Sequence, residues 1–123
     1  MKVSTVVLLV LLVVAGAWFA WKGSLLAPKP VGSFDNFAKC LTEKGAAMYG
    51  ASWCSHCKNQ KKMFGSSWQY VNYVECASSD GGQTQACKDK GITGYPTWDI
   101  SGEFLSGEIS LQVLSDKSGC PLS

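Results

Sequence analysis

Two cysteines separated by two residues, Cys54 and Cys57, constrain this chain more than any other feature of its sequence. They follow the short apolar segment 46–51, which is typical of a strand, and precede segment 58–64, which is typical of a helix. The same spacing occurs at metal sites, at haem attachment sites and at dithiol redox sites. Haem attachment needs a histidine directly after the second cysteine, where this chain has Lys58, so haem attachment is excluded.

The N-terminal segment 3–21 contains no charged residue, and a helix of that length can cross a hydrocarbon layer of about 30 Å. Lysines bracket this segment, and aromatic residues gather at its downstream end, as they do at membrane interfaces. The sequence predicts a membrane anchor over residues 1–22, with the following domain on the extracytoplasmic side. A cleaved signal peptide is the alternative, because the small residues 15–17 fit a cleavage site and cleavage would release a secreted domain.

The rest of the chain divides into a linker, residues 23–33, and one domain, residues 34–123. The linker contains prolines, glycines and serines, which suit an extended tether. Six cysteines in 123 residues are a high density, which in an exported protein indicates a disulfide framework. The net charge of the chain is +2, but from residue 34 onward 8 lysines face 9 acidic residues. This balance argues against nucleic acid as a partner.

Hydrophobic periodicity and turn residues predict that helices and strands alternate in the domain. Helices are expected at 33–43 with Ser33 as N-cap, at 58–64, at 83–91, and at 111–119 with Ser110 as N-cap. Strands are expected at 46–51, 70–76, 95–100 and 103–107. This order predicts an α/β fold, a mixed sheet of about four strands flanked by helices, with the cysteine pair at a strand-to-helix junction.

Cys54 is predicted to be the attacking sulfur and Cys57 the resolving one. A cysteine at a helix start meets unsatisfied N–H groups and the positive end of the helix dipole, and both stabilise a thiolate. His56, when protonated, adds a positive charge that stabilises the reduced form and makes the disulfide more oxidising. A solvated His56 with no such role is the alternative, and the lysines at 58, 61 and 62 are expected to form a solvated helix face.

A zinc site is a rival interpretation of the cysteines, with Cys54, Cys57, Cys76 and Cys87 as two pairs of ligands. The second pair is separated by ten residues, more than zinc motifs use, and we expect neither a metal nor a bound cofactor. A purely structural disulfide between Cys54 and Cys57 is also disfavoured, because so short a loop restrains little chain.

The segments WCSHC, residues 53–57, and GYPT, residues 94–97, resemble two landmarks of the thioredoxin superfamily. Segments 37–65, 70–76 and 91–100 resemble the thioredoxin-like domain fused to bacterial vitamin K epoxide reductase homologues, and its free-standing, membrane-anchored versions. The resemblance implies a thioredoxin-like fold in which Cys54 and Cys57 are the redox pair. It also implies disulfide exchange with exported proteins, and reoxidation by a membrane thiol oxidase of the vitamin K epoxide reductase homologue type.

Pro96 matches the proline that is cis in this family, where it presents the backbone of the preceding residue, here Tyr95, to an extended substrate. Trp53 and Ser55 are expected to contact substrate in the same groove. Ser55 itself replaces the proline common in the family, which is expected to alter the reduction potential. Met48 stands where many relatives carry a buried carboxylate that assists the second cysteine, so proton transfer there is expected to use water or another group.

Cys76 and Cys87 match a second, structural pair of the family. A disulfide between them would close a loop of about a dozen residues and stabilise the fold by about 3 kcal/mol, and a second redox relay is the alternative. Cys40 and Cys120 remain, and few exported domains leave two cysteines free. A bridge between them would tie both ends of the domain together, whereas Cys40 can also serve as a small buried side chain.

These observations predict a membrane-tethered, extracytoplasmic thiol–disulfide oxidoreductase that forms disulfides in cysteine-containing exported proteins. The compartment and His56 favour the oxidase direction. One alternative is a reductase or isomerase fed by a membrane electron donor. The other is a metal-binding module, against which the single histidine argues.

Overall fold

The computed structural model describes the backbone of residues 3–24 and 32–122, and the side chains of residues 3–15 and 32–122. The chain forms two units, residues 1–30 and residues 31–123. The expected linker falls largely on residues 25–31, outside the described part of the chain.

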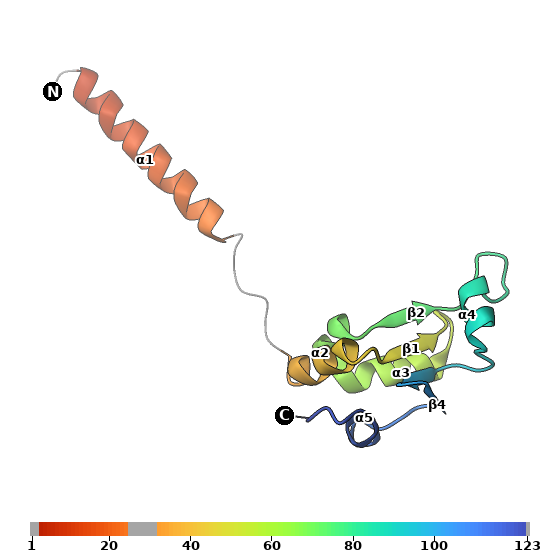
Figure 1. Cartoon of the computed structure of the whole chain (residues 1–123). Helices are drawn as coiled ribbons and strands as arrows, with labels where there is room; N and C mark the ends of the chain where they lie inside the picture. Colours follow the sequence, from red (N-terminus) through yellow and green to blue (C-terminus); the bar gives the residue numbers. More distant parts are fainter. Residues whose placement is uncertain (1–2, 25–31, 123) are drawn as a thin grey trace. The chain divides into compact units, whose positions relative to one another are not determined.

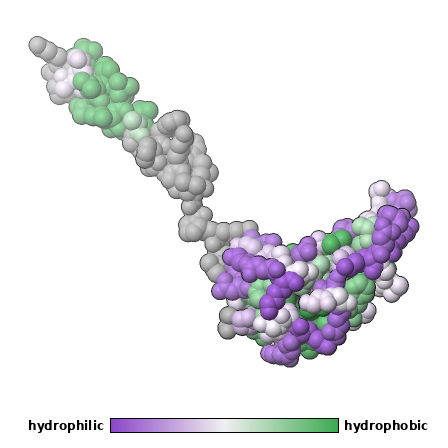
Figure 2. Space-filling view, in the orientation of Figure 1, coloured by the Kyte–Doolittle hydropathy of each residue, from purple (hydrophilic) through white to green (hydrophobic). Residues whose placement is uncertain are grey.

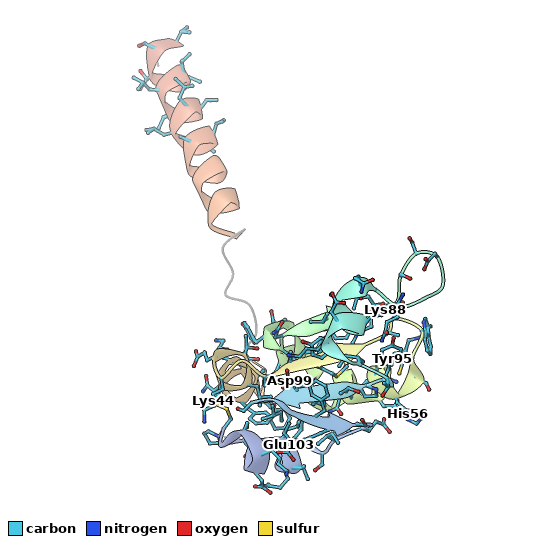
Figure 3. All side chains as sticks on the ribbon, turned by 45° about the vertical axis from the view of Figure 1, so that its right-hand side comes forward. Lys44, His56, Lys88, Tyr95, Asp99 and Glu103 are labelled. Carbon is cyan, nitrogen blue, oxygen red and sulfur yellow. A yellow bond between two sulfur atoms is a disulfide. The ribbon has the colours of Figure 1, made fainter. Side chains whose placement is uncertain are left out.

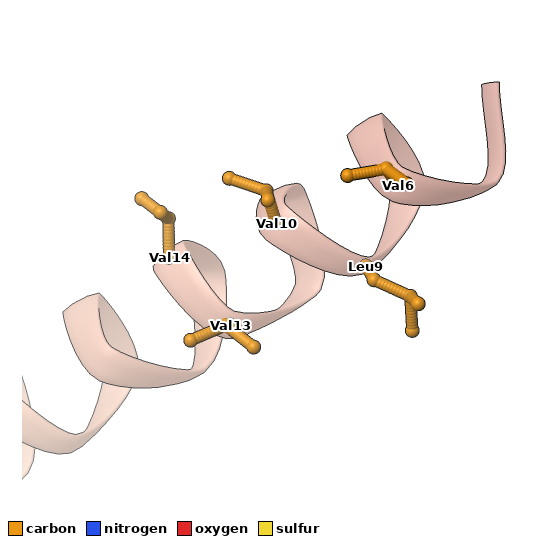
Figure 4. Close-up of a pocket in the computed structure, with 5 residues that line it drawn as sticks. All are labelled: Val6, Leu9, Val10, Val13 and Val14. Atoms are coloured by element: carbon orange, nitrogen blue, oxygen red, sulfur yellow. The ribbon is translucent and has the colours of Figure 1, made fainter. Parts of the chain in front are cut away.

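The first unit contains one helix, α1 (Val3–Ser24) (Figure 1). Its described side chains are exposed, and Figure 2 shows a hydrophobic surface along the described part of the helix. Figure 4 shows how five of these side chains project from the ribbon: Val6, Val10 and Val14 on one side, Leu9 and Val13 on another. Among the residues that the structure describes, no helix combines the length and the apolarity needed to cross a membrane.

The second unit is built on a four-stranded mixed sheet with strand order β2–β1–β3–β4. Strand β1 (Ala47–Gly50) runs parallel to β2 (Tyr73–Glu75) and antiparallel to β3 (Thr97–Ile100), which pairs in turn with β4 (Glu103–Ser106). All four residues of β3 are buried. This sheet and its flanking helices fit the α/β thioredoxin-like fold that the sequence predicts.

Five helical segments flank the sheet: α2 (Asp35–Glu43), α3 (Ser55–Phe64), the 3₁₀ helix η1 (Gly65–Tyr70), α4 (Gln85–Lys90) and α5 (Leu111–Ser118) (Figure 1). The ring of Phe64, at the end of α3, lies between those of Phe37, Trp68 and Trp98, with centroid distances of 5.9, 5.6 and 6.0 Å. These aromatic contacts fix α3 against the core. The cysteine pair at the start of α3 is therefore held on a rigid element.

Several of the expected element starts are wrong, among them those of α2 and β2. Ser33 is not the N-cap of α2, because the helix begins two residues later, after Phe34, and no side chain caps it. The Phe34 N–H instead donates to Ser67 Oγ at 3.0 Å, which ties the chain to η1 just before α2 starts. Strand β2 begins at Tyr73 rather than at residue 70, since the preceding residues belong to η1 and a turn. Ser110, by contrast, caps α5 as predicted.

Two disulfides join the remaining cysteines in the pairings that the sequence suggests. Cys76, directly after β2, is bonded to Cys87 in α4 with a Cα–Cα distance of 5.6 Å. Cys40 in α2 is bonded to Cys120, after α5, with a Cα–Cα distance of 5.9 Å. Both separations lie within the usual range for disulfides.

Candidate active site

Cys54 is the residue from which helix α3 starts. The chain leaves β1, turns through residues 51–53, and holds Cys54 in an extended conformation, with φ −76° and ψ 118°. Its Sγ accepts a hydrogen bond at 3.1 Å from the backbone N–H of Cys57, one of the first-turn donors that has no partner within the helix. The sulfur of Cys54 therefore caps the helix, an arrangement that favours negative charge on it.

The two sulfurs differ in their surroundings, although both are free thiols. Cys54 is 6% exposed, and Cys57 is completely buried. Burial raises the pKa of Cys57 to about 11, and the hydrogen bond with Cys54 and the charge of Cys54 add to the rise. Cys57 is therefore a thiol at neutral pH. This asymmetry suits Cys54 as the sulfur that meets a substrate and Cys57 as the one behind it.

A hollow of about 460 Å³ lies beside Cys54. Its lining comes from the start of α3 and from the segment before β3: Trp53, Cys54, Ser55, His56, Thr93, Gly94 and Tyr95. The structure thus brings the expected groove residues together on one surface. Thr93 and Gly94 were missed, and the signal that could have found them is their position directly before the matched proline.

The two segments meet through Trp53 and Tyr95, whose rings lie edge to face with centroids 5.9 Å apart. Trp53 is 69% exposed, so its ring stands at the rim of the hollow. The peptide bond between Tyr95 and Pro96 is cis, as the resemblance implies, and Pro96 is fully buried. Figure 3 shows His56 and Tyr95 at one end of the domain and Lys44 at the other.

His56 does not stand alone beside Cys54. Its Nδ1 lies 3.2 Å from Oε2 of Glu108, in the segment between β4 and α5. A protonated His56 therefore has a partner of opposite charge, which weakens the positive field expected from the sequence. Sequence reasoning missed Glu108, because 52 residues separate it from His56 and no motif links them.

Met48 is completely buried in β1. Because its side chain is a thioether, this position supplies no carboxylate to assist Cys57. The zinc interpretation loses its second pair of ligands, since Cys76 and Cys87 form a disulfide. Within residues 32–122 and the described part of α1, no three His, Cys, Asp or Glu side chains are grouped in a way that could hold a metal ion.

Comparison with known proteins adds an independent observation. No model of a protein family matches the chain. The chain is 48% identical over 91 residues to the thiol-disulfide oxidoreductase LTO1 of Arabidopsis thaliana. The match covers 69% of this chain and 24% of the relative, so the chain spans about a quarter of that protein's length. This similarity supports an oxidoreductase enzyme.

Proposed function

We propose that this chain is a membrane-tethered thiol–disulfide oxidoreductase that forms disulfides in exported proteins through Cys54 and Cys57. One observation carries the proposal: a helix-capping Cys54 opens onto a hollow, and a fully buried Cys57 lies one turn behind it. This geometry suits a mixed disulfide on the outer sulfur and its resolution by the inner one. The similarity to a named thiol-disulfide oxidoreductase supports the same chemistry.

In the oxidase direction, a substrate thiolate attacks the Cys54 sulfur of the Cys54–Cys57 disulfide, and Cys57 leaves as a thiolate. A second substrate thiolate then attacks the substrate sulfur of the mixed disulfide and displaces Cys54. The substrate departs with a disulfide, and two electrons remain on the Cys54–Cys57 dithiol. A membrane thiol oxidase of the vitamin K epoxide reductase homologue type is the proposed acceptor of these electrons.

The uncharged sequence of segment 3–21 and the aromatic residues at its downstream end support the membrane tether, although the described part of α1 does not itself have the length and apolarity of a membrane-spanning helix. Two disulfides outside the redox pair support an oxidising, extracytoplasmic compartment, because such bonds are rare in the cytosol. Release of the domain after signal cleavage is the alternative, and cysteine-containing exported proteins are the substrates in both cases.

One observation favours a second candidate, a disulfide reductase or isomerase fed by a membrane electron donor. Glu108 pairs with His56 and opposes the charge that would stabilise a Cys54 thiolate. A less stable thiolate makes the disulfide less oxidising. The reduction potential of the full chain in glutathione buffers separates the two candidates. A value around −120 to −180 mV supports the oxidase, whereas a value near −270 mV would assign the reductase.

The exchange chemistry itself is tested by trapping. A Cys57→Ala variant of the full chain, expressed in cells, should accumulate mixed disulfides with exported proteins. They form when the Cys54 thiolate attacks a substrate disulfide and displaces one substrate thiolate, and they persist because no Cys57 sulfur is left to resolve them. Non-reducing electrophoresis and mass spectrometry would identify these adducts. The matched Cys54→Ala variant should trap nothing through this route, and equal trapping by both variants would refute the assignment of Cys54 as the substrate-facing sulfur.

A further inference from the structure

The inner sulfur, Cys57, lies against the backbone of β1 and the side chain of Tyr73 on β2. A Cβ placed on Gly50 would lie 3.0 Å from Cys57 Sγ, 3.0 Å from Cε2 of Tyr73 and 3.3 Å from the Tyr73 hydroxyl. Glycine at this position therefore lets the sulfur and the phenol ring approach the same point of the backbone. The Cys57 sulfur and the edge of the Tyr73 ring are therefore near neighbours across Gly50.

Lys61 lies four residues after Cys57 on α3, on the same face of the helix. Its Nζ lies 4.0 Å from the centroid of the Tyr73 ring and 5.7 Å from that of Trp68. Lys61 is half-buried, whereas Lys58 and Lys62 are exposed. The expected solvated face is therefore correct for two of the three lysines and wrong for Lys61, because the aromatic rings of η1 and β2 hold its ammonium group over them.

The other charged and titratable groups around Cys57 are Cys54, Tyr73 and Glu75. The Tyr73 hydroxyl donates to Glu75 Oε2, and Glu75 Oε1 accepts from the Ser52 N–H at 2.7 Å. Burial raises the pKa of Tyr73, and the bond to Glu75 adds to the rise. Burial opposes ionisation of Glu75, but hydrogen bonds from Tyr73 and Ser52 hold its pKa below the ordinary value. At neutral pH, Tyr73 is neutral, Glu75 is negative and Lys61 is the positive group.

We propose that Lys61, held over the Tyr73 ring, stabilises the thiolate of Cys57 each time that this sulfur attacks or leaves. This inference rests on the proposed function and adds a residue to it. It gives Cys57 an electrostatic partner at a site where Met48 supplies no carboxylate. Lys61 acts through its charge and makes no contact with the substrate.

In the resolving step, Cys57 gives its proton to water and its thiolate attacks the Cys54 sulfur of a mixed disulfide. The bond between Cys54 and the substrate breaks, and the substrate sulfur leaves with the electron pair and then takes up a proton. In the opposite direction, Cys57 is the sulfur that leaves as a thiolate. A fixed positive charge favours both directions, because negative charge develops on the same sulfur. Consistent with this, the charge of Lys61 lowers the pKa of Cys57 against the effect of burial.

The test resolves the reactions of Cys54 and Cys57 as two successive kinetic phases. The reduced full chain, kept in mild detergent, is mixed in a stopped-flow instrument with a nitrobenzoate disulfide that releases a coloured thiolate at each exchange. Attack by Cys54 gives a first phase that scales with reagent concentration, and attack by Cys57 gives a second phase that does not. Lys61→Gln should slow the second phase about tenfold at neutral pH, equivalent to about one pKa unit, and leave the first phase unchanged.

The controls isolate the charge and its position. Lys61→Arg should restore most of the second-phase rate, because a guanidinium keeps the charge and stacks on aromatic rings. Lys62→Gln, which removes the charge of an exposed neighbour, should leave both phases unchanged. The profile of second-phase rate against pH should move to higher pH in Lys61→Gln, a shift that a merely structural role would not produce.

A wild-type second phase in Lys61→Gln, or equal slowing in Lys61→Arg or Lys62→Gln, would overturn the role of Lys61 and leave the proposed function intact. If the wild-type chain shows no first phase faster than that of a small free thiol at the same pH, the proposed function itself fails. The two failures are therefore distinguishable in one recording.

Discussion

The Cys54–Cys57 pair and the Cys40–Cys120 pair border the same hydrophobic core. The first pair opens onto a surface hollow, whereas the second is a disulfide packed at the end of the domain. Cys54 caps a helix and faces a hollow beside Trp53. Cys120 is 1% exposed, and its carbonyl oxygen accepts from Ser115 Oγ at 2.5 Å. The second pair lies near Lys44, whose backbone N–H donates to the Cys40 carbonyl at 3.0 Å and whose Nζ donates to the Ser118 carbonyl at 2.9 Å. Figure 3 shows Lys44 at the opposite end of the domain from His56.

The difference shows that reactivity and stabilisation depend on different features of a cysteine pair. A disulfide between Cys54 and Cys57 would span a single helical turn and restrain little of the unfolded chain. The Cys40–Cys120 bridge closes a loop with a sequence separation of 80, and the Cys76–Cys87 bridge one of 11. Access and helix position make the first pair suited to exchange, whereas loop length makes the other two suited to stabilising the fold.

Removing the long bridge should have the largest effect on stability. The Cys40→Ala/Cys120→Ala variant is expected to lose about 4.5 kcal/mol of unfolding free energy, because its loop restrains the most unfolded chain. The Cys76→Ala/Cys87→Ala variant is expected to lose about 3 kcal/mol. Urea unfolding of the full chain, followed by tryptophan fluorescence, measures both losses.

The same two variants test whether the structural disulfides stabilise the fold without contributing to disulfide exchange. Under conditions where both remain folded, each should show the fast Cys54 exchange phase of the unmodified chain. Equal stability losses would contradict the argument from loop length. Loss of fast exchange in a folded variant would show that the bridge also shapes the redox site.

A smaller effect should appear between the two redox states at high pH. The pKa of Cys57 is about 11 in the reduced fold, above the ordinary value of 9.0, chiefly because of burial. Between these values the unfolded chain loses this proton while the folded chain keeps it, so stability falls as the pH rises from about 9 to about 11. The expected loss for the reduced form is roughly 2–3 kcal/mol, because each pKa unit corresponds to about 1.4 kcal/mol.

The oxidised form provides the control, because its Cys54–Cys57 disulfide has no thiol to titrate. Tyr73, whose pKa is also raised, titrates in both forms, and the largest causes of its raised pKa, burial and the hydrogen bond to Glu75, are present in both. Urea unfolding is measured at several pH values for the oxidised form and for a form in which only this pair is reduced. Above pH 9, the free energy of unfolding of the reduced form should fall relative to that of the oxidised form. A difference independent of pH would mean that Cys57 is not the buried thiol described here.

The sequence predicts the pairs and the fold well because the relevant signals are local or carried by a resemblance. The strand-to-helix junction places Cys54 at a helix start, and the GYPT segment brings Tyr95 to the same surface. The start of α2 could not be predicted in this way. Ser33 is a good capping residue by type, but the hydrogen bond from Phe34 to Ser67, 33 residues away, decides where the helix begins.

Two residues whose surroundings the sequence did not reveal, Lys61 and Glu108, share one property: their neighbours come from other elements. Lys61 looks like a solvated helix residue until η1 and β2 place the rings of Trp68 and Tyr73 beneath it. Glu108 lies in the segment after β4, and only the folded domain brings it to His56. Local pattern thus predicts which sulfurs react, whereas the charges around them depend on tertiary packing.

Breaking the pairing of His56 with Glu108 should give the smallest effect of these variants. It tests directly whether a charge brought in by tertiary packing influences Cys54. Their side chains are 68% and 30% exposed, and pairs of this kind contribute below about 1 kcal/mol. Glu108→Gln leaves the charge of a protonated His56 unopposed beside Cys54, so the Cys54–Cys57 disulfide should become more oxidising. The equilibrium constant with glutathione should change by less than tenfold, so the reduction potential should rise by less than about 30 mV. Glu103→Gln, which breaks the exposed Glu103–Lys117 pair at β4, removes the same charge and should not change the potential. If Glu108→Gln shifts the potential no more than Glu103→Gln does, or makes it more reducing, then His56 does not set the charge at Cys54.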